Sequence, residues 1–214
     1  MSSGNDFLVT HGVFVERHSS LYERMSDAWQ DMRASTRRLI LEKPSEARLL
    51  FYVMMSDMIF FLSWSIKALV SPTAGAAARM PLEVAFWLVV ALFFRTSTLY
   101  LCAILLGSVA RICGGTATWR ETRTAIFWGA LVAAPFGFAC AMITVVLSVL
   151  EPRFPALGAD WITLPPYWLS LIPFVYFISA GIAEAHQFRR TSTVFAMMSV
   201  AAVVAIFGFL VLRA

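Results

Sequence analysis

Five apolar segments of about 20 residues each dominate the sequence, and they restrict its fold more than any other feature. A helix rises about 1.5 Å per residue, so a segment of this length crosses the ~30 Å hydrocarbon core of a bilayer. The segments lack the ten-residue alternation that is typical of a membrane β-barrel. We therefore predict an all-α, polytopic membrane protein with five transmembrane helices, near residues 49–70, 83–109, 124–149, 165–185 and 193–212.

The overall composition agrees with this assignment. Of the 214 residues, 59% are hydrophobic and only 14% are charged, which excludes an ordinary soluble domain. The charged residues that do occur lie mainly in the first 48 residues and between the apolar segments. We expect two parts: a cytoplasmic tail over residues 1–48 and a five-helix transmembrane domain over residues 49–214.

The tail contains a pattern that is typical of an amphipathic helix. Ser20 and Glu23 have the spacing of a capping box, which places a helix start at Ser20. Apolar residues then recur at three- and four-residue steps, in the order Leu21, Met25, Trp29, Met32 and Leu39. Such a helix either lies in the membrane interface or docks on protein, and both readings stay open at this stage. Pro44 ends the segment, and Ser45 can cap the first span.

The distribution of positive charge indicates the orientation. The net charge is +4, but the basic residues do not form the stripe that nucleic acid requires, so we expect no nucleic-acid partner. Most of them lie in the tail and in the second and fourth connections: Arg33, Arg37, Arg38, Lys43, Arg48, Arg111, Arg120, Arg123, Arg189 and Arg190. The other side has Arg79, Arg153 and Arg213. The positive-inside rule then predicts a cytoplasmic N-terminus and an external C-terminus.

Two charged residues lie inside the predicted spans. Asp57 falls in the first span and Arg95 near the middle of the second. A charged group at this depth needs a partner, a water-filled cavity or a route to the interface. We predict that Asp57 and Arg95 form a pair that joins the first two spans, with a solute or proton pathway as the alternative.

The third span carries a small residue at every fourth position. The residues are Ala125, Gly129, Ala133, Gly137 and Ala141, and we call them the small-residue ridge. Helices in lipid associate through close backbone contact, which small residues permit. We expect the ridge to be a packing surface covered by the fifth span, which has small residues of its own; a helix of another subunit is the competing neighbour.

No pattern in the chain indicates catalysis. The three cysteines form no CxxC pair, and Gly114 and Gly115 belong to no phosphate-binding motif. Glu184 and His186 are two residues apart, so they do not share a helix face, and we interpret them as interfacial polar residues. We expect no enzyme activity, no cofactor and no metal site.

Several short motifs, taken in order, resemble the bacterial branch of the Yip1-domain family. They are Pro44-Ser45-Glu46-Ala47, the run from Arg111 to Thr116, Pro135 in the third span, and the run from Ile182 to Arg189 before a fifth span. The resemblance covers roughly residues 40–214. It implies an all-helical protein with a cytoplasmic N-terminus in a bacterial inner membrane, and hence a periplasmic C-terminus. Eukaryotic members are linked to Rab GTPases, but nothing in this sequence identifies a GTPase contact, so that role is not carried over.

Two classes of function follow from these features. The first is a non-catalytic scaffold or accessory subunit, which the small-residue ridge and the amphipathic tail favour. Its partners would be membrane lipids and other membrane protein subunits. The alternative is a small transporter or permeation protein that uses the Asp57–Arg95 pair.

Overall fold

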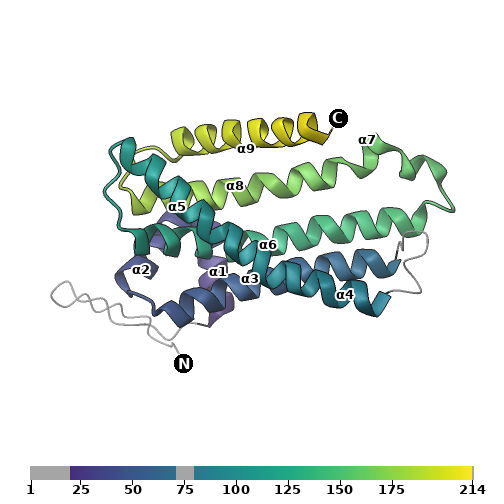
Figure 1. Ribbon diagram of the computed structural model, residues 1–214, viewed down its shortest axis with the longest axis horizontal. Coiled ribbons are helices and arrows are strands. Elements are labelled where there is room, and N and C mark those ends of the chain that lie inside the picture. Colours follow the sequence, from purple (N-terminus) through teal and green to yellow (C-terminus); the bar gives the residue numbers. More distant parts are fainter. Residues whose placement is uncertain (1–19, 71–79, 214) are drawn as a thin grey trace, which may run out of the picture.

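The computed structural model describes residues 20–70 and 80–213, and the regular elements in these two ranges are all helices (Figure 1). Four helical segments are long and apolar enough to cross a membrane: Glu46–Val70, Leu82–Ile112, Trp119–Leu150 and Trp161–Ala185. The protein is therefore an all-α membrane protein. The last helix, α9 (Thr191–Arg213), has a shorter described apolar stretch, Thr191–Val204, so the fifth span stays a prediction. Residues 1–19 of the tail and the connection containing Arg79 lie outside the described ranges.

The tail contains two helices where the sequence predicted one. They are α1 (Leu21–Gln30) and α2 (Met32–Leu41), and the predicted continuous helix is wrong. Asp31 adopts an extended backbone conformation, and its carboxylate accepts a hydrogen bond from the Ala34 amide at 3.0 Å. An aspartate in this position starts a new helix because it satisfies an amide that has no helical partner. The predicted capping box at Ser20 is confirmed, with both reciprocal hydrogen bonds to Glu23 present.

The apolar stripe of α1 and α2 packs on the protein's own helices. Met32 and Leu39 are buried, and Leu21 and Met25 are partly buried against the same core. The Trp29 indole donates a hydrogen bond to a main-chain carbonyl of the third span. Of the two readings that the sequence left open, the structure therefore favours docking on protein for this face of the tail.

The first two spans are α3 (Glu46–Val70) and a longer, composite helix. As predicted, the Ser45 hydroxyl accepts a hydrogen bond in the first turn of α3, from the Arg48 amide at 3.2 Å. The second span consists of α4 (Met80–Val89), the π-helix η1 (Val90–Arg95) and α5 (Thr96–Ile112). A π-helix is rare within a span, and its position at Arg95 bears on the site described below.

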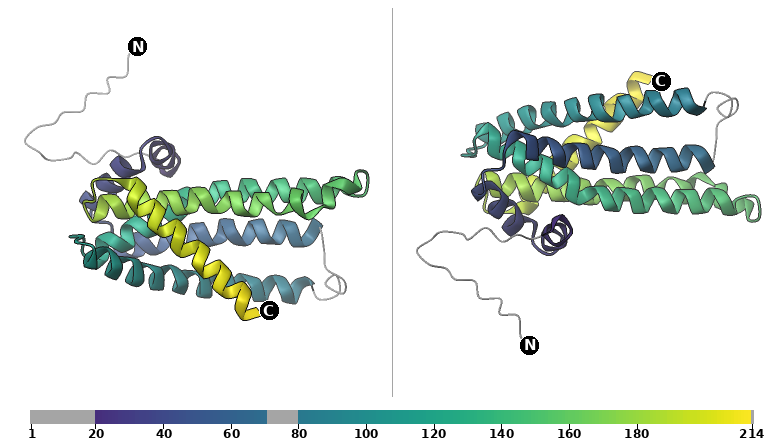
Figure 2. Two further views of the ribbon diagram at one scale, coloured as in Figure 1. Left: turned by 90° about the horizontal axis from the view of Figure 1, so that it is seen from above. Right: turned by 90° about the horizontal axis from the view of Figure 1, so that it is seen from below.

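The third span, α6 (Trp119–Leu150), is the centre of the bundle, between α3 and α8 (Figure 1). It starts in a capping box formed by Thr118 and Glu121. The short helices η2 (Pro155–Gly158) and α7 (Asp160–Thr163) connect it to α8 (Pro165–Ala185). Helix α9 packs chiefly against α8 and crosses the bundle obliquely (Figure 2). Helices α1 and α2 gather at the opposite end of the molecule from η2 and α7 (Figure 1).

Two glycines shape the turn between α5 and α6. Gly114 has a φ of 89°, in the left-handed region that favours glycine. The Gly115 amide donates to the Ala110 carbonyl at 2.8 Å, which closes the end of α5. A Cβ on Gly115 would collide with the ring of His186. The first glycine is thus needed for the backbone conformation and the second for the close approach of the end of α8.

Candidate functional site

An ion pair between α3 and η1 lies within the membrane-spanning part of the bundle. Asp57 is fully buried, and one of its carboxylate oxygens accepts a hydrogen bond from the Arg95 guanidinium. The other oxygen accepts a hydrogen bond from the Thr96 hydroxyl at 2.5 Å. The structure thus brings together the two charged residues that the sequence paired, and adds Thr96 as a second donor.

The π-helix η1 explains how two consecutive residues reach the same carboxylate. A π-helical turn is wider than an α-helical turn, so neighbouring residues are separated by a smaller angle around the axis. Arg95 ends η1 and Thr96 begins α5, and both side chains point to Asp57 on α3. No sequence pattern indicates this widened turn, because Val, Ala, Leu and Phe are ordinary residues of a membrane-spanning α-helix.

Side-chain hydrogen bonds connect α6 to α3 and α1 in the turn before Pro135. Ser56 accepts a hydrogen bond from Arg95 at 3.0 Å and donates one to the Ala130 carbonyl at 3.2 Å. From the other side, Trp29 donates to the Val132 carbonyl at 3.0 Å. Pro135 has no amide hydrogen, which weakens the hydrogen-bond ladder in this turn. The bonds from α3 and α1 therefore hold α6 where its own helical bonding is interrupted.

The N-terminal half of α6, which we call its inner half, carries the part of the small-residue ridge that packs against α8. A Cβ on Gly129 would lie 3.2 Å from the Ile178 Cα, and a Cβ on Gly181 would lie 3.0 Å from the Ala125 carbonyl oxygen. Each helix therefore presents a glycine to the backbone of the other. The prediction that the fifth span covers the ridge is wrong: α8, the fourth span, is the neighbour, because its glycine matches the ridge and the two helices pack along their length.

The C-terminal half of α6, which we call its outer half, carries the part of the ridge that lines a cavity. Nothing lies within 4 Å of a Cβ placed on Gly137. Gly137, together with Ala133 and Ala141, borders a cavity of about 440 Å³ between α3, α6 and α8. Arg95 and Ser56 lie at one end of its lining and Lys67 at the other. Ala133 is buried, whereas Gly137 and Ala141 are partly exposed; at these two positions the expectation that the ridge is a packing surface is wrong within the described chain, because α3 and α8 leave space there.

Glu184 is a buried anchor for the tail. It was interpreted as an interfacial polar residue, but its side chain is only 7% exposed, and one oxygen pairs with Arg33 at 2.8 Å and the other with Arg37 at 2.5 Å. Arg33 also donates to the Phe188 carbonyl at 3.0 Å. The interfacial interpretation is therefore wrong, because α2 covers the end of α8 and removes Glu184 from solvent.

His186 is also buried, contrary to the interfacial interpretation. Its Nε2 lies 3.0 Å from the Thr122 hydroxyl of α6, and its ring stacks on Phe188. Burial lowers the pKa of His186, the neighbouring Arg111 lowers it further, and Glu121 acts in the opposite direction. At neutral pH this histidine is therefore an uncharged link between α8 and α6.

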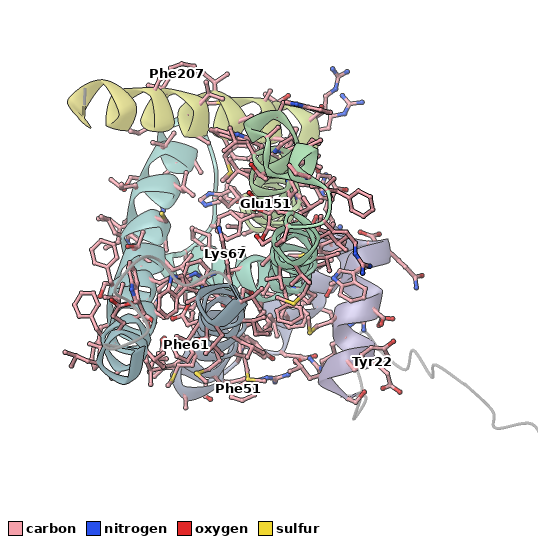
Figure 3. All side chains as sticks on the ribbon, turned by 90° about the vertical axis from the view of Figure 1, so that its right-hand side faces the viewer. Tyr22, Phe51, Phe61, Lys67, Glu151 and Phe207 are labelled. Atoms are coloured by element: carbon pink, nitrogen blue, oxygen red, sulfur yellow. The ribbon has the colours of Figure 1, made fainter. Side chains whose placement is uncertain are left out.

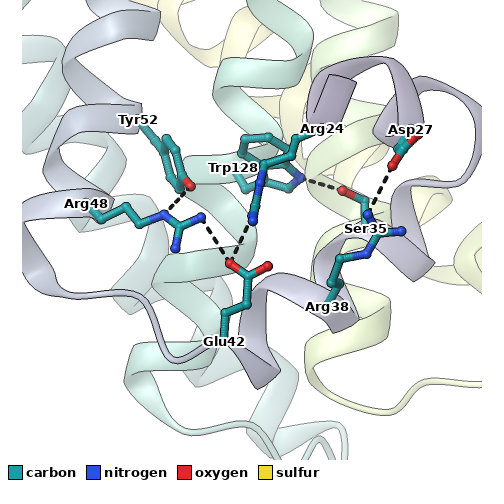
Figure 4. A network of polar contacts seen from close by, with 8 residues as sticks. All are labelled: Arg24, Asp27, Ser35, Arg38, Glu42, Arg48, Tyr52 and Trp128. Carbon is teal, nitrogen blue, oxygen red and sulfur yellow. Dashed lines mark hydrogen bonds and ion pairs between the residues drawn. The ribbon is translucent and has the colours of Figure 1, made fainter. Parts of the chain in front are cut away.

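A second polar network joins α1, α2 and α3 at the same end of the molecule (Figure 4). Glu42 accepts hydrogen bonds from Arg24 at 2.9 Å and Arg48 at 3.0 Å, and Arg48 donates to the Tyr52 hydroxyl at 2.7 Å. Trp128, fully buried in α6, donates from its indole to the Ser35 hydroxyl at 3.1 Å. These contacts are local ion pairs and hydrogen bonds that hold the tail on the bundle.

The remaining candidates for chemistry are dispersed. Cys102, Cys113 and Cys140 are free thiols on separate parts of α5, the following turn and α6. Among the described residues, no three histidine, cysteine or carboxylate side chains are grouped so that they could hold a metal ion.

No family model, curated protein or solved structure matches this chain. The ion pair, the cavity and the buried anchor are therefore interpreted from their own geometry.

Sequence reasoning missed the anchor and the cavity for different reasons. Glu184 has an arginine pair some 150 positions earlier, Arg33 and Arg37, whose four-residue spacing places them on one helix face. That spacing was a usable signal. The cavity had no such signal, since its lining comes from three helices whose relative positions are set only by packing.

Proposed function

We propose that this protein is a non-catalytic accessory subunit or scaffold that packs against other membrane proteins in a bacterial inner-membrane complex. The observation that carries the proposal is the state of the two carboxylates that are most buried among the residues whose burial the structure describes. Asp57 and Glu184 each have both oxygens engaged by donors from the same chain. A carboxylate that is held in this way stabilises an architecture, because releasing it would leave buried charges without partners.

The proposal includes five spans, with a cytoplasmic N-terminus and a periplasmic C-terminus. It is supported by the basic residues of α2, of the α5–α6 turn and of the segment after α8, because these three segments lie at the same end of the bundle and such a concentration is typical of a cytoplasmic face. Reporter fusions test it: a periplasm-active reporter should be silent at residue 115 and active at residue 160. The reverse pattern would exclude this orientation.

We expect the partner to pack on α9. This helix contacts chiefly α8, and its side chains at Met197, Val200 and Val204 are exposed. Exposed apolar residues are normal in lipid, but a span with few neighbours in its own chain leaves the most surface for another subunit.

Co-purification in mild detergent tests the proposed subunit role. Ala201→Phe enlarges the exposed surface of α9 without entering the bundle, and it should lower the amount of a partner that is retained at fixed stoichiometry. Val146→Phe makes a matched change on the exposed surface of α6 and should leave retention unchanged. If the wild-type protein is recovered alone and monomeric after crosslinking in membranes, the scaffold proposal is wrong.

A small permeation protein is the second candidate, and the cavity beside Arg95 favours it. In this case liposomes containing the protein should pass ions or protons, and Asp57→Asn should abolish the flux while the protein stays folded. Liposomes that are no leakier than empty ones would exclude this candidate.

A further inference from the structure

The buried ring of His186 has one nitrogen without a hydrogen-bond partner. His186 directly follows α8 and is 1% exposed. Its Nε2 lies 3.0 Å from the Thr122 hydroxyl, whereas its Nδ1 is buried and has no partner within the described part of the chain. The end of α8 lies where α1 and α2 gather, and the opposite end of the bundle, with Glu151, faces the viewer in Figure 3. Buried polar atoms are nearly always hydrogen-bonded, so the state of Nδ1 requires an explanation.

The hydrogen bonds of Thr122 determine which ring nitrogen carries the proton. The Thr122 hydroxyl donates its single hydrogen to the Thr118 carbonyl at 3.1 Å, so its oxygen accepts a hydrogen bond from the Nε2–H group of His186. The other tautomer would bury an N–H group at Nδ1 without an acceptor, which is unfavourable. The neutral ring is therefore protonated at Nε2, and Nδ1 keeps a free lone pair.

This lone pair faces the turn between α5 and α6, residues 113–118. A Cβ placed on Gly115 would lie 2.3 Å from Nδ1, so the ring packs directly on the Gly115 backbone. The Gly115 amide is already bonded to the Ala110 carbonyl at 2.8 Å. A proton added to Nδ1 would therefore point at the glycine backbone, where it finds no acceptor and is closed off from water.

Charged groups from each neighbouring helix act on the ring. Arg111, at the end of α5, disfavours a positive charge on His186, and Glu121, in the first turn of α6, favours one. Glu184 of α8 is already paired with two arginines of α2. Burial and Arg111 outweigh Glu121, so the pKa of His186 is lowered in the folded protein. The closed contact between the turn and the ring thus requires a neutral histidine.

The turn can move away from α8 without breaking its own hydrogen bonds. The Arg111 guanidinium donates to the Ala117 carbonyl at 3.0 Å, and this bond lies within the connection between α5 and α6. Toward the rest of the molecule the turn makes an apolar contact, because Ala117 belongs to a buried cluster with Ala185, against which Ile40 of α2 packs. Displacing the turn would therefore open Nδ1 to water and uncover part of the surface on which α2 rests.

We propose that His186 is a proton-dependent switch, which holds the α5–α6 turn against the end of α8 while its ring is neutral and releases the turn when Nδ1 is protonated. Release gives the new N–H group access to water and separates the imidazolium from Arg111. It also loosens the contact of the turn with α2, because Ala117 leaves the cluster with Ala185 and Ile40. The inference does not depend on the subunit role, since every contact of the switch lies within one chain.

Hydrogen exchange of the full chain in mild detergent, measured by mass spectrometry between about pH 7.5 and 5, tests the switch. Exchange rates are corrected for the known pH dependence of the chemical step. In the open turn the ring is solvated and has an ordinary pKa of about 6.5. Below this pH, opening is favoured by up to about tenfold per pH unit until the lowered pKa of the closed state is reached. The turn should lose protection accordingly, while residues 124–133 of α6 stay protected.

Three variants isolate the contribution of the ring. His186→Gln keeps an amide donor for Thr122 but cannot become charged, so its turn should stay protected over the whole pH range. His18→Gln removes a different histidine of the chain and should behave as the wild type does. Gly115→Ala places a methyl group against the ring, and its turn should be unprotected even at neutral pH.

Nitrogen-15 NMR of the wild-type imidazole tests the switch without any variant. At neutral pH the proton of His186 should be on Nε2, and the ring should titrate at the pH at which the turn loses protection. Equal loss of protection in the wild type and in His186→Gln would overturn the proposal, and so would a wild-type turn that stays protected in acid. Simultaneous loss of protection in residues 124–133 would show unfolding of the bundle instead of release of the turn. A proton on Nδ1 at neutral pH would contradict the tautomer on which the switch depends.

Discussion

The inner and outer halves of α6 carry small residues at the same four-residue spacing, but they have opposite environments. Every residue from Thr124 to Ala133 is buried by α1, α2, α3, α5 and α8. From Ala134 to Leu150 nearly all residues are at least partly exposed, and Gly137 borders a cavity. The difference shows that small residues permit a close helix contact but do not produce one. The neighbour must also present a backbone without a large side chain, as α8 does at Gly181.

The same substitution in the two halves should give the largest contrast. Gly129→Leu would drive a side chain into the Ile178 backbone, which cannot move away without separating α6 from α8. We expect it to lower stability by about 3 kcal/mol or to prevent folding, since overpacking against a backbone is at the upper end of such effects. Gly137→Leu should leave thermal unfolding in detergent unchanged. Equal effects at the two positions would remove the distinction between the halves.

The ion pair between α3 and η1 lies beside α6, to which Ser56 links it through the Ala130 carbonyl, and it gives the next largest effect. Arg95→Ala leaves Asp57 buried with Thr96 as its remaining donor, and should cost about 3 kcal/mol. Adding Asp57→Asn removes the stranded charge, so the double variant should be more stable than Arg95→Ala alone. Denaturant unfolding of the two single variants and the double variant measures this coupling. Additive losses would show that the two side chains act independently.

Variants of Glu184 test whether its ion pairs with Arg33 and Arg37 hold the tail helices on the bundle. Glu184→Gln should loosen α1 and α2 and lower stability by about 2 kcal/mol, the range expected for hydrogen bonds to a charged group. Limited proteolysis should then cut within residues 20–44. Arg33→Ala should have a larger effect than Arg37→Ala, because Arg33 also binds the carbonyl oxygens that follow α8. Protection from proteolysis in Glu184→Gln would mean that apolar contacts alone hold the tail.

The smallest expected effect is a pH dependence of folding stability, which comes from His186 at the end of α8. The pKa of His186 is lowered in the folded state, so below about pH 6.5 the unfolded chain takes up a proton before the folded chain does. Stability should therefore be highest above that pH and fall as the pH decreases toward the lowered pKa. Thermal unfolding between about pH 7.5 and 5 measures this, with His186→Gln as the variant that should lose most of the dependence. An equal slope in both proteins would assign the effect to other groups.

Local sequence patterns were sufficient for the helices and for some of their ends. The capping box at Ser20 and the cap at Ser45 follow from hydrogen bonds between residues three positions apart. The pair of Asp57 and Arg95 was also predictable, because a charge in lipid needs a partner and few are available. The break at Asp31 was missed because the apolar stripe continues across it, although aspartate is a common helix cap.

By itself, the sequence determined an all-α membrane protein, the approximate positions of its apolar helices and the need for an intramembrane ion pair. These properties depend on hydropathy over about 20 residues and on the high free energy of an unpaired charge in lipid, and both are local. Only the tertiary structure decided that α8 covers the ridge, that Glu184 holds the tail, and that a cavity lies beside Gly137. Each of these depends on which surfaces of separate helices meet, and lipid offers a helix an apolar environment on every side, so the sequence of one helix does not identify its neighbour.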